Sequence, residues 1–355
     1  MTRPMAGPPG ALAEPRPDGP DTMGREIAEG PDAVAATLLD VEASRQRIAL
    51  LLADARRIIL FGTGASLAVS RIAAPIWRRA SPGGLELVIR QATEAALGDL
   101  DGLQFNPTDA VVAISQSGSS PETLSAARLA RRAGASVLAL TADPDSALAS
   151  TATLSVPLAS GREAGAATKS AMASLAGLLG IAGSLRCDEP HVSDLQDGLA
   201  GIIAAWQEAM GPGRRLAGAR HAWMLGFGAA KGIAAAGSLL WHEKLVRPAT
   251  AATPSEFRHG LIEAVRREDV VVLFAMPGGD TAEARYVDRL RAELRALEVD
   301  LVELSPMADD AGRAALELLL RIQQLARAAV LVAGTYRDEF AILRHVVKPA
   351  DDLPA

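Results

Sequence analysis

Five polar residues and a glycine, Ser115-Gln116-Ser117-Gly118-Ser119-Ser120, directly follow a short apolar run at residues 111–114. Helical periodicity begins at about residue 122, so the segment is predicted to join a strand to a helix. Ligands of open α/β sheets bind at the carboxyl ends of strands, where a helix N-terminus offers unpaired N–H groups and a partial positive charge. Serine also caps helices, but four hydroxyls and an amide exceed what a cap needs. The segment therefore indicates a phosphate or sugar site.

Two further strand ends carry a Gly-x-Gly motif, Gly62-Thr63-Gly64 and Gly226-Phe227-Gly228. This motif opens the dinucleotide-binding fingerprint, which also needs a third glycine and an acidic residue after the second strand. Leu67 stands at the place of the third glycine in the first motif, and the next strand ends at Arg90. The sequence thus disfavours a nicotinamide, and neither an organic cofactor nor a metal is predicted.

The order of these motifs indicates a repeated architecture. Apolar runs of strand length alternate with stretches of helical period, and the pattern of strand, Gly-x-Gly and helix occurs twice in halves of similar length. We therefore predict an α/β protein with two tandem, doubly wound parallel sheets. Strands are expected at residues 58–61, 85–89, 111–114, 136–140, 153–156, 222–225, 269–274 and 301–304, and long helices at 32–53, 67–79, 281–297 and 313–331.

Three motifs together resemble the SIS (sugar isomerase) double-domain family. They are Ser115-Gln116-Ser117-Gly118, Glu163-Ala164-Gly165-Ala166-Ala167-Thr168-Lys169 and Ser255-Glu256-Phe257-Arg258-His259-Gly260. The likeness is to the isomerase part of glucosamine-6-phosphate synthase and to the SIS-type glucosamine-6-phosphate deaminases. It implies two flavodoxin-like three-layer domains and a homodimer. The glutaminase domain of the synthase has no counterpart in the sequence.

The resemblance also implies roles for matching residues. Glu243 corresponds to the carboxylate that moves a proton between C1 and C2 of the sugar, and His259 to an imidazole that assists ring opening from the partner subunit. A carboxylate with a raised pKa suits the first task, and histidine suits proton transfer near neutrality. The residues that match sugar-phosphate contacts are Ser66, Ser115, Gln116, Ser117, Ser120, Gly165 and Ala167.

Two family lysines are missing at their expected places. The lysine three residues before the glutamate falls on Leu240, and the lysine of the C-terminal tail falls on His345. The loop before Thr168 is also one residue shorter than in the synthase. His345 is predicted to serve as an acid–base group in the site, whereas nothing in the sequence shows that Lys348 reaches it. The losses weaken any step that relies on an amine.

Composition limits the remaining classes of function. A net charge of −6 and a pI near 5.5 argue against a nucleic-acid-binding surface, and a single cysteine, Cys187, fits a reducing compartment. No segment reads as membrane-spanning, so a cytoplasmic protein is expected. We predict a disordered tail at residues 1–22, a helix and first SIS domain at 23–190, a second SIS domain at 191–340, and a tail entering the site at 341–355. A hinge is expected between residues 186 and 199.

The favoured function is isomerisation of glucosamine 6-phosphate to fructose 6-phosphate with loss of ammonia. Two alternatives remain open at this stage. One is a deglycase acting on a fructosamine 6-phosphate or a similar conjugate, and the other is a sensor that binds a sugar phosphate without turnover.

Overall fold

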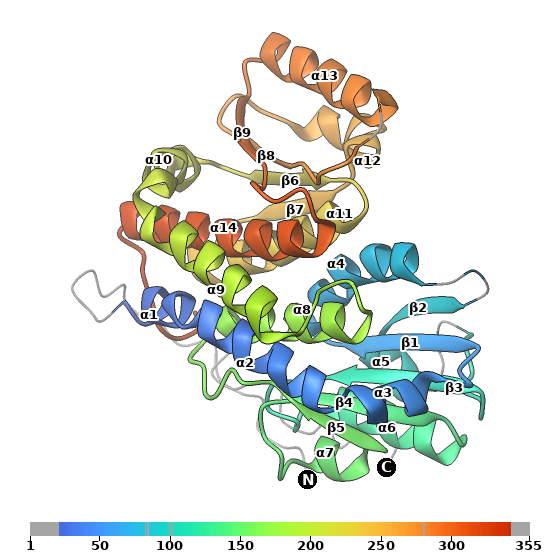
Figure 1. Ribbon diagram of the computed structural model, residues 1–355. Helices are drawn as coiled ribbons and strands as arrows, with labels where there is room; N and C mark the ends of the chain where they lie inside the picture. Colours follow the sequence, from blue (N-terminus) through green and yellow to red (C-terminus); the bar gives the residue numbers. More distant parts are fainter. Residues whose placement is uncertain are drawn as a thin grey trace, which may run out of the picture.

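The computed structural model describes residues 21–341, except residues 82, 84, 99, 101 and 280. Most of the predicted N-terminal tail, and the C-terminal tail from residue 342 with His345, lie outside the described residues. Two parallel sheets, each covered by helices, lie one above the other in Figure 1. No helix in the described part of the chain is long and apolar enough to cross a membrane.

The first sheet has five parallel strands in the order β2-β1-β3-β4-β5. They are β1 (Arg57–Gly62), β2 (Glu86–Gln91), β3 (Asp109–Ile114), β4 (Ser136–Thr141) and β5 (Leu154–Pro157). Its helices are α2 (Gly30–Ala43), α3 (Arg45–Leu52), α4 (Gly64–Ala80), α5 (Ala92–Ala96), α6 (Pro121–Arg132), α7 (Ala147–Thr151) and α8 (Lys169–Ile181). The β-branched and apolar runs of β1 and β3 are almost wholly buried, as expected for a sheet with helices on both faces.

The second sheet has four parallel strands in the order β7-β6-β8-β9. They are β6 (Ala222–Gly226), β7 (Ala249–Ala252), β8 (Val270–Phe274) and β9 (Asp300–Leu304). The accompanying helices are α10 (Met210–Gly218), α11 (Ala229–Leu240), α12 (Pro254–Arg258), α13 (Thr281–Ala296) and α14 (Ala311–Val332). Strand β7 was not predicted, because its sequence Ala-Thr-Ala-Ala has little β propensity. The strand depends on its pairing with β6.

Two expectations about helices were wrong. The single helix expected over residues 32–53 is two, α2 and α3, which meet at Ser44. The hinge expected at residues 186–199 is instead the start of α9 (Glu189–Ala204): the Asp188 side chain accepts from the His191 N–H as an N-cap, and Pro190 occupies the first turn. Asp188 and Pro190, which interrupt the apolar pattern of the sequence, therefore begin a helix.

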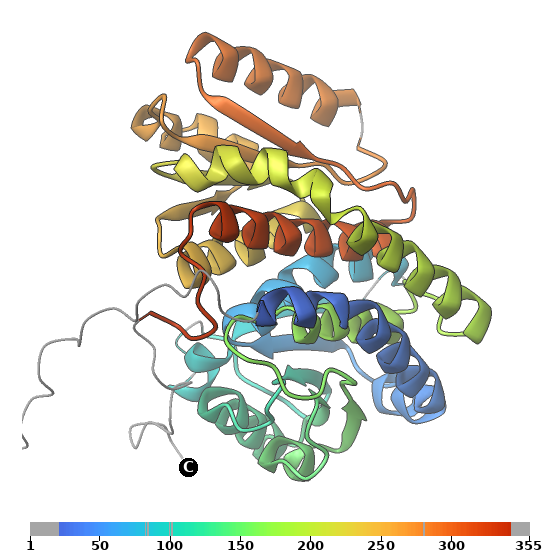
Figure 2. The same cartoon turned by 90° about the vertical axis from the view of Figure 1, so that its left-hand side faces the viewer.

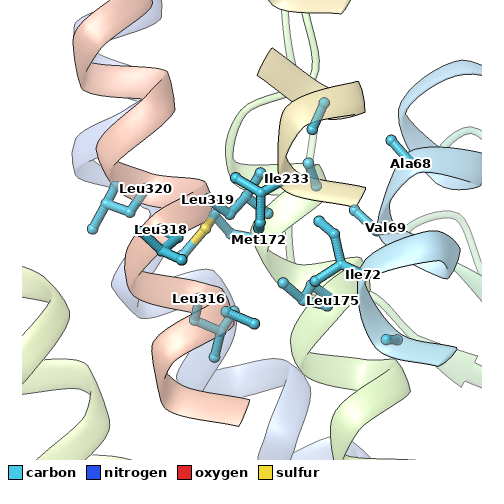
Figure 3. Packing of buried hydrophobic residues seen from close by; sticks show 14 of the residues in the cluster. Ala68, Val69, Ile72, Met172, Leu175, Ile233, Leu316, Leu318, Leu319 and Leu320 are labelled. Carbon is cyan, nitrogen blue, oxygen red and sulfur yellow. The ribbon is translucent and has the colours of Figure 1, made fainter. Parts of the chain in front are cut away.

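The two sheets are joined by a shared hydrophobic core. Figure 3 shows Ile72 of α4, Met172 of α8, Ile233 of α11 and Leu319 of α14 packed together, and all four belong to one buried cluster. Helices α4 and α11 run antiparallel at the centre of this cluster. A Cβ on Gly232 would lie 2.5 Å from the Ile72 nitrogen, so glycine permits their close approach. The core therefore fixes how the two halves face each other.

The first and last described segments meet beside the first half of the chain. Helix α1 (Thr22–Ala28) is tied to the segment after α14, because Met23 N–H donates to Tyr336 Oη over 2.9 Å. In Figure 2 this segment (red) leaves α14 and descends from the second half towards the first. The result is a strap of chain, residues 336–338, at the level where the two halves meet.

Candidate active site

The serine-rich segment forms the turn between β3 and α6 at the carboxyl edge of the first sheet. Ser115 Oγ and Ser120 Oγ are 3.0 Å apart and share a hydrogen bond, and Gln116 Nε2 donates to the Gly161 carbonyl over 2.8 Å. Ser117 Oγ is exposed and accepts from the Ser119 hydroxyl at 2.9 Å. The turn is thus braced by Ser115, Gln116 and Ser120, and presents Ser117 to solvent.

The first Gly-x-Gly motif lies at the same edge. Strands β1 and β3 are direct neighbours, and a Cβ on Gly62 would lie 3.2 Å from the Ile114 carbonyl oxygen. Ser66 sits in the first turn of α4, directly after this motif. Because the chain turns to opposite sides of β1 to form β2 and β3, this edge is the switch point of the sheet, the usual ligand position in such folds. The structure therefore places Ser66 and residues 115–120 along one edge.

A carboxylate network shapes the loop that carries Gly165 and Ala167. Glu163 Oε1 accepts from the N–H and the hydroxyl of Thr168, each over 2.8 Å. Glu26, from α1, accepts from the Ala164 N–H over 2.6 Å, and burial raises its pKa. Its second oxygen is buried without a partner among the described residues. The loop is therefore held from inside by Glu163 and from the N-terminal helix by Glu26.

Glu243 lies in a single π-helical turn, Trp241–Leu245, that follows α11. Such turns are frequent at functional sites. The turn ends at Val246 with a φ of 54°, a left-handed conformation that a β-branched residue rarely adopts. Glu243 lines a cavity of about 10 Å³, roughly the space of one water, together with Ala65, Ala167 and Leu240. The fold thus brings Glu243 to the loop of Ala167 and the start of α4.

The environment of Glu243 tunes its acidity. The pKa of Glu243 is raised to about 7: burial is the main cause, the Lys244 ammonium opposes it, and nearby Glu163 adds a smaller increase. A carboxyl group with such a pKa is divided between its acid and its base near neutral pH, which is the property required to take and return one proton.

Lys244 is a functional candidate that the sequence analysis did not identify. It is only 2% exposed, and its ammonium donates to the carbonyl oxygens of Arg337 and Asp338 over 3.0 and 3.1 Å. A Cβ on Gly165 would lie 3.0 Å from the same nitrogen and would collide with the Asp338 carbonyl. Burial lowers the pKa of Lys244. An amine beside Glu243 therefore clamps the strap of residues 336–338 over the Gly165 loop.

Lys244→Met should loosen this strap. Each hydrogen bond from a charged donor contributes about 1.5–3 kcal/mol, so amide hydrogen exchange in residues 336–338 should accelerate by about tenfold or more. Mass spectrometry of exchange measures it. Lys231→Met serves as the matched control, because its ion pair with Glu256 is exposed and distant from the strap. Equal exchange in all three proteins would show that Lys244 does not hold the strap.

His259 does not share the Glu243 cavity. It lines a separate open hollow of about 550 Å³, with Lys231, Glu256 and Gly260, where α12 ends. His242, next to Glu243 in sequence, turns away and accepts from the Ala249 N–H over 3.1 Å. Whether His259 completes a site in a second subunit remains a prediction. Among the described residues no group of three or more His, Cys, Asp or Glu side chains could hold a metal ion.

Glu243 should also make stability depend on pH. Its folded pKa is raised, so the contribution of its acid form is complete below pH 4.5 and is lost as the pH rises through 7. The Glu243→Gln protein has no carboxyl group to ionise at this position, so it does not lose stability in this way. Its free energy of unfolding, relative to the parent protein, should therefore rise by about 1–3 kcal/mol between pH 5 and pH 8.

Urea unfolding at the two pH values measures this change. Glu268→Gln, at an exposed position, is the control and should show little pH-dependent difference from the parent. If Glu243→Gln and the parent protein had the same free energy of unfolding at both pH values, the raised pKa of the half-buried Glu243 carboxyl would be contradicted.

Comparison with known proteins agrees with this geometry. Residues 51–179 match the SIS domain. The isomerizing glutamine–fructose-6-phosphate aminotransferase of Sulfurisphaera tokodaii is 25% identical over 326 residues, which are 89% of this chain and 53% of that protein. The N-acetylmuramic acid 6-phosphate etherase of Rubrobacter xylanophilus is 34% identical over 143 residues, 36% of this chain and 48% of the etherase. The chain spans about half the length of the curated relatives it matches.

Solved structures extend the likeness to both sheets. The tagatose-6-phosphate ketose/aldose isomerase of Escherichia coli superposes with a TM-score of 0.78 at 22% identity, covering 94% of this chain and 99% of that one. The glucosamine-6-phosphate deaminase of Thermotoga maritima gives 0.67 at 19% identity, covering 89% and 96%. Residues 51–179 therefore form a SIS domain, and nearly the whole described chain shares the fold of the solved tagatose-6-phosphate isomerase.

Proposed function

We propose that this chain converts glucosamine 6-phosphate to fructose 6-phosphate and ammonia. The observation that carries the proposal is Glu243: a shielded carboxyl group with a pKa of about 7, in the same small cavity as Ala167 and the start of α4. The aminotransferase relative supports the choice of substrate, since its match covers 89% of this chain and its name includes both fructose 6-phosphate and isomerisation. The etherase match covers 36%.

In the proposed reaction the open-chain sugar is held by its phosphate at the serine turn. Ser117, with the N–H groups at the start of α6, receives the phosphate without burying a cation against it. Ser66 and the Gly165 loop contact the sugar from the two sides. These positions leave the C1–C2 bond to face Glu243.

Glu243 then removes the proton from C2, and the electron pair forms the C1–C2 double bond of the enolamine. The C1 oxygen takes a proton from solvent, and the nitrogen gives one back to solvent when the imine forms. The protonated carboxyl returns the proton to C1, which becomes the CH₂OH carbon while C2 becomes an imine. Water adds to the imine and ammonia leaves, so glucosamine 6-phosphate and water give fructose 6-phosphate and ammonia. A base that gives back the proton it takes needs a pKa near the working pH, as Glu243 has.

The experiment follows ammonia and fructose 6-phosphate from a panel of hexosamine 6-phosphates, with Glu243→Gln as the inactive reference. Stoichiometric release of both products from glucosamine 6-phosphate is the expected result. Release of an amino acid from a fructosamine 6-phosphate, with no ammonia from glucosamine 6-phosphate, would replace the proposal by the deglycase. A rise in melting temperature with no product from any sugar would replace it by a sensor.

A further inference from the structure

We infer that the second half of the chain carries its own binding site for a small phosphorylated sugar, which it holds without converting. The site is a cavity of about 600 Å³ at the carboxyl ends of β6 and β8. Strand β6 lies between β7 and β8, so the cavity stands at the switch point of the second sheet, as the proposed active site stands at that of the first. The ligand class rests partly on the proposed function; the cavity does not.

The two sites correspond residue by residue along the central helices. Gly64 and Gly228 stand at the starts of α4 and α11, with φ of 52° and 54°. Glu243 lies 15 residues after Gly228 (243 − 228), and Arg79 lies 15 residues after Gly64 (79 − 64). Arg79 therefore occupies at the second site the position that Glu243 occupies at the first.

The linings of the two cavities repeat this relation. The antiparallel helices exchange ends, so the start of one meets the finish of the other at each site. With a constant offset of 164 residues in sequence number (228 − 64), the pairs that line the first and second cavities are Ala65 with Ala229, Leu239 with Pro75, Leu240 with Ile76, and Glu243 with Arg79. Such agreement follows from the internal duplication, and makes the second cavity the counterpart of the first.

The turns after the inner strands match as well. Strand β3 ends at Ile114 and its turn contains Gly118 with a φ of 61°; β8 ends at Phe274 and its turn contains Gly278 with a φ of 75°. Both glycines stand four residues after the strand end. The second turn, however, carries Met276 and Pro277 where the first carries Gln116 and Ser117. It lacks the hydroxyls, so another group must bind the phosphate.

Arg79 supplies that group. Its guanidinium is exposed to the cavity and has no ion-pair or hydrogen-bond partner in the described part of the chain. Arginine binds phosphate with two parallel hydrogen bonds, which makes it the usual choice for this task. Because this arginine replaces the carboxylate base of the first site, the second site holds the anion and lacks the base at the place where the reaction would need it.

The remaining walls suit a sugar. Phe227 and Tyr286 form an edge-to-face pair with centroids 5.7 Å apart, which gives the apolar faces of a sugar ring a surface to contact. Ser255 and the Glu283 carboxylate line the same cavity and are suitable partners for hydroxyls.

Titration calorimetry with glucosamine 6-phosphate tests the inference. The Glu243→Gln protein is used so that the sugar is not consumed, and three further changes are compared on this background. Arg79→Leu removes the proposed phosphate ligand, Ser117→Asp repels phosphate from the first site, and Arg71→Leu is the control on an exposed face of α4 outside the cavity. Two binding events per chain are expected, of which Arg79→Leu weakens one at least about tenfold and Ser117→Asp weakens the other.

The other possible results distinguish the second site from the proposed active site. A single event that Ser117→Asp removes and Arg79→Leu spares overturns the second site and leaves the proposed function intact. A single event with the opposite sensitivity supports the second site and removes the proposed function. Two events that are both insensitive to Arg79→Leu, or two that Arg71→Leu weakens equally, overturn the assignment to this cavity. No binding at all overturns both.

Discussion

Glu243→Gln is expected to lower kcat for glucosamine 6-phosphate by about 10²- to 10⁴-fold, with KM changed only a few-fold. The amide has the shape of the carboxyl but cannot take the C2 proton. Glu243 lies in a shielded cavity rather than on the serine turn, so substrate binding should survive the substitution. Steady-state kinetics with a coupled assay for ammonia measures both constants.

The pH dependence of kcat provides the internal control. The parent enzyme should lose activity below about pH 7, where Glu243 becomes protonated, because burial raises its pKa to about that value. The residual activity of Glu243→Gln should lack this limb. A parent profile flat from pH 5 to 8, or a variant with undiminished kcat, would exclude Glu243 as the base.

Gly118→Ala should weaken binding of the sugar phosphate and destabilise the protein by about 2–4 kcal/mol. Gly118 has a φ of 61°, and a Cβ there would lie 2.7 Å from Thr141 Oγ1 and collide with Ser146. The turn must shift to accept the methyl group, which combines backbone strain with overpacking. The same shift would move Ser117 and the N-terminus of α6, so KM should rise by tenfold or more.

Urea unfolding and steady-state kinetics check this expectation. Gly201→Ala is the matched control, since its Cβ would meet nothing within 4 Å on α9, where alanine favours the helix. That variant should be as stable as the parent or slightly more stable, with unchanged KM. If Gly118→Ala behaved like the control, the serine turn would be neither rigid nor required for the proposed phosphate binding.

Much of the fold follows from the sequence because its strands are locally distinctive. Residues 58–61 and 111–114 are buried β-branched and apolar runs that end at glycine- or serine-rich turns, and both became strands flanking the switch point. Where local signals were ambiguous, tertiary context decided. The alanine-rich β7 exists only through its pairing with β6, and the polar residues after Arg186 cap a helix rather than form a hinge.

The site was predictable only to the extent that its residues lie in contiguous motifs. The serine turn is recognisable in the sequence as a cluster of hydroxyl groups. Glu243 was identified only from the family resemblance, because the residues beside it in sequence do not show that the chain folds over it. The role of Lys244 depends on carbonyl groups 93 and 94 residues away, and that of Glu26 on an amide 138 residues away. The correspondence of Arg79 with Glu243 could be recognised only from the residues that line the two cavities. The sequence repeat alone shows only that the two halves are alike.

The most direct test of the account follows hydrogen exchange at carbon. The chain is incubated in D₂O with glucosamine 6-phosphate, and also with fructose 6-phosphate and ammonium, and deuterium at C1 and C2 is measured by NMR. We expect deuterium in the substrate pool or the product with the parent protein, because the protonated carboxyl exchanges with solvent in part of the turnovers, and none above background with Glu243→Gln. Equal exchange in both proteins, or bound sugar with neither exchange nor product in the parent protein, would contradict a proton transfer by Glu243.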